Sequence, residues 1–151
     1  MNEDMRRLVE EQRLGYVATV GPDGSPNLSP KGTTAVWDSE HLVFAHIHSH
    51  QTVANIEAGN DKVEINVVDP IKRRGYRFTG VAVVYRTGPV FDAGLRFYHE
   101  RSNLDPSRCL AIVLVRVTHA SAIISPSYDD GTSEHDIESR SLALYGLERR
   151  R

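Results

Sequence analysis

Hydroxyl, amide and basic side chains gather between Ser25 and Thr52, where they could bind an anion. Lys31 stands beside a glycine and two threonines in the segment SPKGTT, which begins at Ser29. A second polar segment, SHQT, begins at Ser49 and is typical of a helix start, whose free amides and positive dipole end attract anions. If the two segments meet in the fold, they form a phosphate site in which each charge-assisted hydrogen bond contributes about 1.5–3 kcal/mol.

Three histidines alternate between these segments, at His46, His48 and His50. On a continuous strand they would share one face and could ligate a metal ion. We expect a helix to begin near Ser49, however, and this helix would turn His50 away from the other two. No carboxylate or cysteine near them in the sequence completes the four ligands of a zinc site. We therefore predict no metal site and interpret the histidines as the wall of a pocket.

The same spacing is similar to that of the histidine-triad nucleotide hydrolases, whose motif places apolar residues between and after the histidines. Ile47 fits that pattern, whereas Ser49 and the pair Gln51-Thr52 do not. A metal-dependent hydrolase that uses these histidines is therefore kept as an alternative interpretation of the stretch.

Length, composition and charge indicate an ordinary globular domain. The chain has 151 residues, of which 40% are hydrophobic and 25% are charged, and its formal net charge is −2. This balance favours neither nucleic acid nor an anionic membrane as a partner, and no apolar segment is long enough to cross a bilayer. The charged N-terminus lacks the apolar core of a secretory signal, and a sole cysteine, Cys109, fits a reducing compartment. We expect a cytoplasmic protein.

Turn residues and apolar alternation predict the elements that position the polar segments. We expect a leading helix over residues 2–13, capped by Asn2 and ended by Gly15. Gly80 within a long strand indicates a bend or a bulge, and Asp92 is expected to cap a helix. The remaining elements are strands over residues 14–20, 26–37, 41–47, 62–68, 76–86 and 109–124, and helices over residues 49–58 and 92–102.

Strands joined by short turns outnumber the helices, and this order predicts an antiparallel sheet rather than parallel β-α units. Six strands with few residues to spare tend to close into a barrel, because closure removes exposed strand edges. We therefore predict one mainly β domain over residues 1–124. The polar remainder, residues 125–151, is predicted to be a tail that packs on the barrel or on a dimer partner.

Four segments together resemble the pyridoxamine 5′-phosphate oxidase-like, FMN-binding split-barrel proteins. They are the hairpin LGYVATVGPDGSPNLSP, the strand HLVFAHI, the helix and strand SHQTVANIEAGNDKVEINVV, and the strand GYRFTGVAVVY, and the resemblance covers residues 14–124. The resemblance implies a six-stranded antiparallel split β-barrel that works as a homodimer with two FMN molecules at the interface.

The resemblance also implies which residues border the cofactor. The phosphate would be held from the second strand and the helix start, backbone near Gly32 and residues 45–47 would border the flavin ring, and Arg77 would face the partner's cofactor. The candidate cofactor-binding residues are Ser29, Lys31, Gly32, Thr33, Thr34, Ala45, His46, Ile47, His48, Ser49, Gln51, Thr52 and Arg77.

One departure from the family pattern narrows the expected function. The oxidase proper carries arginine and lysine on the second strand and at the helix start, whereas this chain keeps only Lys31. The resemblance therefore implies the wider flavoprotein family, including members that bind the deazaflavin coenzyme, more than the vitamin B6 reaction itself.

No nucleophile, base and acid stand together in the sequence, so no catalytic side chain is predicted. In a flavoprotein the cofactor carries the hydride chemistry. We expect an oxidoreductase that transfers hydride or electrons from a reduced nicotinamide or deazaflavin donor to a small-molecule acceptor. The alternative is a non-catalytic flavin or haem carrier on the same barrel.

Overall fold

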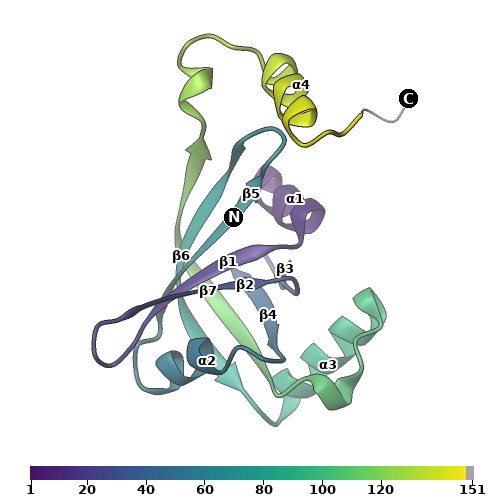
Figure 1. Cartoon of the computed structure of the whole chain (residues 1–151). Helices are drawn as coiled ribbons and strands as arrows, with labels where there is room; N and C mark the ends of the chain where they lie inside the picture. Colours follow the sequence, from purple (N-terminus) through teal and green to yellow (C-terminus); the bar gives the residue numbers. More distant parts are fainter. Residues whose placement is uncertain (149–151) are drawn as a thin grey trace.

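An antiparallel sheet of seven strands frames the protein in the computed structural model, which describes residues 1–148 (Figure 1). The strands are β1 (Gly15–Val20), β2 (Pro26–Lys31), β3 (Ala35–Val36), β4 (His41–His46), β5 (Lys62–Asp69), β6 (Arg74–Tyr85) and β7 (Ala111–Ile124), in the order β2-β1-β5-β6-β7-β4-β3. Every neighbouring pair is antiparallel, and the sheet curls into a half-barrel. The predicted antiparallel, mainly β split-barrel class is confirmed.

The prediction of one continuous strand over residues 26–37 is wrong. The backbone N–H of Thr34 donates to the carbonyl of Lys31 at 3.2 Å, and the Thr34 hydroxyl donates to the same carbonyl at 2.8 Å. These two bonds close a turn after Lys31, so β2 ends there and β3 follows as a short strand of its own. The sheet of the described residues therefore has seven strands instead of six.

The leading helix, α1 (Glu3–Gln12), packs its apolar stripe against the sheet. Asn2 caps it as predicted, because its side chain accepts a hydrogen bond from the N–H of Met5 at 2.9 Å. The predicted end at Gly15 is wrong, since the helix ends at Gln12 and its C-cap, Arg13, adopts the left-handed conformation with a φ of 55°. Gly15 instead lies in β1, where a Cβ atom would come within 2.5 Å of a neighbouring side chain.

Three further helices belong to the described residues: α2 (His50–Glu57), α3 (Pro89–Ser102) and α4 (Glu134–Leu144), with 3-10 turns at Pro106–Arg108 and Pro126–Tyr128. The prediction that Asp92 caps a helix is wrong, because α3 begins at Pro89 with Gly88 as its N-cap. The predicted polar tail contains α4, and residues 149–151 of that tail lie outside the described residues. Over residues 1–148, no helix has the length and apolarity that a bilayer crossing requires.

A bulge in β6 curves the sheet, as the glycine in the predicted strand indicated. The register of β6 against β7 shifts between Thr79 and Gly80. A Cβ atom at Gly80 would lie 2.5 Å from the carbonyl oxygen of Arg116, so only glycine lets the strands approach this closely. The curled sheet encloses a core that includes the fully buried rings of Phe44 and Phe78.

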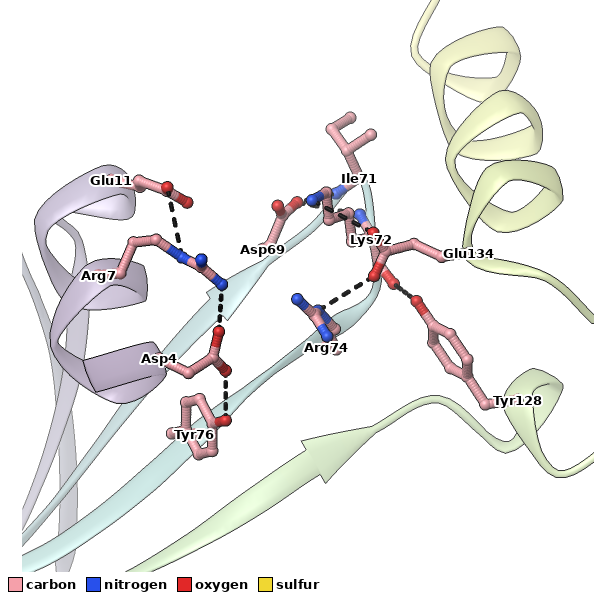
Figure 2. A network of polar contacts seen from close by, with 10 residues as sticks. All are labelled: Asp4, Arg7, Glu11, Asp69, Ile71, Lys72, Arg74, Tyr76, Tyr128 and Glu134. Atoms are coloured by element: carbon pink, nitrogen blue, oxygen red, sulfur yellow. Dashed lines mark hydrogen bonds and ion pairs between the residues drawn. The ribbon is translucent and has the colours of Figure 1, made fainter. Parts of the chain in front are cut away.

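A surface network of charges joins α1, the turn between β5 and β6, and α4 (Figure 2). Glu134 at the start of α4 pairs with Lys72 and Arg74, each at 3.3 Å. Asp4 of α1 accepts a hydrogen bond from the hydroxyl of Tyr76 on β6 at 2.5 Å. The network therefore ties the N-terminal and C-terminal helices to the same strand pair.

Candidate functional site

The two polar segments predicted to hold an anion meet where β2 faces α2. Asn27, Ser29 and Lys31 alternate along β2, so their side chains leave the same face of the strand. The Lys31 ammonium donates to the Ser29 hydroxyl at 2.7 Å. It also donates, at 3.3 Å, to the hydroxyl of Thr52 in the first turn of α2. A single lysine therefore joins the strand segment to the helix start.

Lys31 is a buried cation whose charge no carboxylate of residues 1–148 balances. Only 3% of its surface is exposed, and burial lowers the pKa of its ammonium group to about 8. The ring of Phe44 lies 5.7 Å from Nζ and offers only a weak cation–π contact. Buried charges in proteins are ordinarily paired. An unpaired one is suited to bind an anionic group that the chain itself does not supply.

The hydrogen bonds around Lys31 leave more donors than acceptors. The Thr52 hydroxyl accepts from Lys31 and, at 3.2 Å, from the amide of Asn27. The Thr19 hydroxyl accepts from Asn27 and from Asn55, both at 3.0 Å. A hydroxyl has two lone pairs and one proton, so both threonines have used their acceptors and keep a proton to donate. An acceptor-rich group such as a phosphate would satisfy these donors.

The threonines of the SPKGTT segment shape the turn instead of facing the ammonium. Thr33 Oγ1 accepts from the backbone N–H of Ala45 at 3.0 Å, and the Thr34 hydroxyl bonds the Lys31 carbonyl. The structure therefore does not bring these two predicted hydroxyls to the Lys31 ammonium. A Cβ atom built on Gly32 would meet nothing within 4 Å, so open space adjoins the backbone next to Lys31.

The link between β4 and α2 arranges the histidines differently from the prediction. His46 is buried at the end of β4, whereas His48 is exposed. The rings of His46 and His50 lie edge to face with their centroids 5.3 Å apart. The expectation that the helix start turns His50 away is therefore wrong. His50 is the first residue of α2, and the short link leaves its ring against the end of the strand.

The buried imidazole of His46 has a nitrogen, Nδ1, without a hydrogen-bond partner. Burial is the main cause that lowers the pKa of His46, and the neighbouring His50, Arg86 and Lys31 lower it further. Among residues 1–148, no three His, Cys, Asp or Glu side chains group together as metal ligands. The geometry therefore gives no support to a histidine-based metal hydrolase.

The three remaining predicted residues near the helix start differ in their burial and in their hydrogen bonding. Ser49 takes the N-cap position of α2, and its side chain makes no capping hydrogen bond. Gln51 is exposed and donates to the side chain of Asn55 at 2.7 Å. Ile47 is half-buried in the link before the helix. Of these three, Ser49 has a polar side chain that makes no capping hydrogen bond at the helix N-terminus.

Arg77 lies outside the cluster around Lys31. Its neighbour Phe78 is buried in the core, so alternation along β6 directs Arg77 to the outer face of the sheet. There it pairs with Glu64 at 3.1 Å, and 49% of its side chain is exposed. Within one chain, Arg77 is not brought to the other predicted site residues.

Sequence reasoning missed the amides of Asn27 and Asn55 and the hydroxyl of Thr19, which complete the cluster. Each of them had a signal in the pattern. Asn27 shares one face of β2 with Lys31, and Thr19 pairs directly with Asn27 in the register of β1 against β2. Asn55 lies three residues after Thr52, on the same face of α2.

A curled antiparallel sheet, with a buried lysine of β2 against the start of α2, defines the split-barrel class of proteins. The family model described as pyridoxamine 5′-phosphate oxidase matches residues 1–121. The chain therefore belongs to the pyridoxamine 5′-phosphate oxidase family. The resemblance stated from the sequence is confirmed. No curated protein matches the chain.

Solved structures give the same fold. HupZ of Group A Streptococcus is 30% identical with a TM-score of 0.74, and the match covers 83% of this chain and 95% of that one. An F420 reductase is 29% identical with a TM-score of 0.61, and the match covers 80% and 98% of the two chains. HutZ, a heme storage protein from Vibrio cholerae, is 18% identical with a TM-score of 0.62 and coverages of 80% and 92%. This last likeness shows the fold alone.

Proposed function

We propose that the protein binds FMN with its phosphate held between Lys31 and the N-terminus of α2. The donors there are the Lys31 ammonium, the hydroxyls of Ser29 and Thr52, and the free amides of the first helical turn. The observation that carries the proposal is the buried, unpaired charge of Lys31. A phosphate supplies the counter-charge that residues 1–148 lack at this point.

The residues around Lys31 fit this group in hydrogen bonding as well as in charge. The hydroxyls of Thr19 and Thr52 keep protons to donate, and a phosphate ester bears acceptor oxygens. The open space beside Gly32 gives the rest of the cofactor room to extend from its phosphate. Ser49 adds a hydroxyl at the N-cap of α2.

Bound FMN supplies hydride and electron transfer, so we propose an oxidoreductase that moves them from a reduced nicotinamide or deazaflavin donor to a small-molecule acceptor. The residues of this chain bind and orient: Lys31 fixes the phosphate, and the backbone near Gly32 borders the open space beside it. The protein itself supplies position and electrostatics rather than a reacting side chain.

We also propose a cytoplasmic homodimer with the cofactor at the subunit interface. The outer face of β1 and β2 exposes large apolar side chains, with 41% of Tyr16 and 66% of Leu28 accessible. Exposed apolar groups that cluster on one sheet face favour association with another protein surface. Arg77 lies on the outer face of the same sheet, where it could reach the cofactor of a partner.

A second candidate cofactor is the deazaflavin coenzyme, which the similarity to an F420 reductase favours. The same lysine and helix start would hold its phosphate. A non-catalytic carrier of flavin or haem is the alternative from another class, and the heme storage protein HutZ shares the fold.

Titration of the purified protein separates these proposals. Flavin fluorescence should quench on binding of FMN, and riboflavin, which lacks the phosphate, should bind about 100-fold more weakly or worse. No binding of FMN at any concentration up to saturation of a control flavoprotein overturns the FMN proposal. Binding of the deazaflavin coenzyme or of haem in its place, followed by absorbance, identifies the alternative cofactor. Anaerobic reduction of the bound flavin by NADPH or by reduced deazaflavin distinguishes an oxidoreductase from a carrier.

A further inference from the structure

His46 presents a buried polar atom without a partner close to the proposed phosphate position. It follows Phe44 on the same face of β4, and the Lys31 ammonium lies 5.7 Å from the Phe44 ring. His50 of α2 contacts the His46 ring, with the ring centroids 5.3 Å apart. Only 2% of His46 is exposed, and its Nδ1 atom lacks a hydrogen-bond partner. An unsatisfied buried group of this kind often marks a functional role.

Four charged or titratable groups face His46 from the elements packed around it. They are Lys31 of β2, His50 and Glu57 of α2, and Arg86 beyond the end of β6. Arg86 and Glu57 neutralise each other through a two-pronged ion pair at 2.8 and 3.1 Å. Among these groups Lys31 therefore supplies the unbalanced charge, and that charge is positive.

One positive charge does not balance a phosphomonoester. The second ionisation of such a group has a pKa of about 6, so FMN carries close to two negative charges at pH 7. Leaving an excess negative charge in a buried site is unfavourable. Uptake of one proton by the site removes the excess, and His46 is the titratable group placed to accept it. In the free protein, burial and the nearby cations keep the pKa of His46 low, so the ring is neutral before the anion arrives.

We propose that His46 is the second cation of the phosphate site, so that binding of a doubly charged phosphomonoester is coupled to protonation of His46. The proton comes from the solvent, and the imidazole then carries an N–H at both ring nitrogens. This inference rests on the proposed phosphate site at Lys31. It makes His46 a positioning residue that favours phosphomonoesters over singly charged phosphodiesters.

Isothermal titration calorimetry at pH 7.0, in two buffers of different ionisation enthalpy, measures the protons taken up per FMN bound. The wild-type protein should take up about one proton, and His46→Gln close to none, with FMN affinity reduced about tenfold. Riboflavin 4′,5′-cyclic phosphate has the same ring system and a singly charged phosphodiester, so the wild type should bind it with almost no proton uptake. His99→Gln removes an exposed histidine of α3 and should keep the wild-type uptake.

Uptake near zero in the wild type, or equal uptake in the wild type and in His46→Gln, overturns the proposal. If His46→Gln does not fold, nitrogen-15 NMR of the wild-type imidazole decides instead. A ring that is neutral without FMN and charged with FMN supports the inference, and a ring that stays neutral in both states overturns it. Failure of both flavins to bind is a different result, because it overturns the phosphate site at Lys31 itself.

Discussion

Two polar networks of this protein contain similar side chains but differ in whether their cations pair with carboxylates. In the network of Figure 2, Arg7 contacts Asp4, while Lys72 and Arg74 share Glu134. These side chains are between 36% and 61% exposed. In the cluster at the start of α2 the cation is buried, and none of residues 1–148 offers it a carboxylate. The first network is complete within the chain, whereas the second leaves a buried cation unpaired, and we propose that a ligand completes it.

The density of charges along the sequence does not locate the buried, unpaired cation. The basic run from Lys72 to Arg74 has three consecutive cations, yet two of its members pair with a carboxylate at the surface. Such exposed pairs contribute about 0–1 kcal/mol each. Lys31 stands without another cation beside it in the sequence, yet it is buried, and its burial lowers the pKa of its ammonium group. We propose that this unpaired, buried charge marks Lys31 as a binding residue.

Replacing the buried lysine should have the largest effect on binding. Lys31→Met removes the charge that we propose holds the phosphate, so FMN affinity should fall by about 100-fold, in keeping with the loss of one or two charge-assisted bonds. Lys72→Met removes a lysine from the surface network and should leave affinity unchanged. Flavin fluorescence titration measures both variants. Equal losses of FMN affinity in the two variants would show that the buried lysine does not contribute more to binding than the surface lysine.

The depressed pKa of Lys31 predicts how the stability of the cofactor-free protein depends on pH. The ammonium has a pKa of about 8 in the folded protein and its ordinary 10.5 in the unfolded chain. Between these values the unfolded chain binds more protons, so the free energy of unfolding rises with pH across this window, by up to about 3 kcal/mol. Urea denaturation at several pH values, compared with Lys31→Met, isolates this group. If the free energy of unfolding depends on pH in the same way in the two proteins, the lowered pKa does not belong to Lys31.

A smaller effect on binding is expected from the hydroxyl that links Lys31 to α2. Thr52→Val keeps the shape of the side chain and removes the proton that is free to be donated, so FMN affinity should fall about tenfold. Thr118→Val makes the same change at an exposed position of β7 and should leave affinity at the wild-type value. A titration in which both valine variants bind like the wild type would remove Thr52 from the site.

The surface network should give the smallest change. Glu134→Gln weakens both of its ion pairs, so the free energy of unfolding should fall by about 1 kcal/mol or less, and the difference should shrink at high salt. FMN affinity should not change. Urea denaturation at low and high salt tests this expectation. A large loss in the free energy of unfolding that does not depend on salt would mean that the network contributes more than exposed ion pairs do.

The fold and the meeting of the two polar segments could be predicted because they follow from local patterns. Alternation and turn residues defined the antiparallel strands, and Gly80 marked the bulge of β6. The end of β2 could not be predicted in this way, because it depends on the hydroxyl of Thr34 bonding a backbone carbonyl. The contacts of Thr19 with Asn27 and Asn55 depend on strand register and on where α2 lies over the sheet. The contact of His50 with His46 depends on the path of a short link, which periodicity does not describe.

We propose that the protein keeps Lys31 buried, at a loss of stability when free, because Lys31 holds the phosphate of a cofactor. Urea denaturation of the wild type and of Lys31→Met, each with and without FMN, tests both halves of the claim together. Without FMN, Lys31→Met should be more stable by about 1–3 kcal/mol. With FMN at about 1,000 times the wild-type Kd, the wild type should gain about 4 kcal/mol, whereas Lys31→Met, with its about 100-fold weaker affinity, should gain only about 1.4 kcal/mol. A wild type that is already the more stable protein without FMN, or that gains nothing from FMN, would contradict the account.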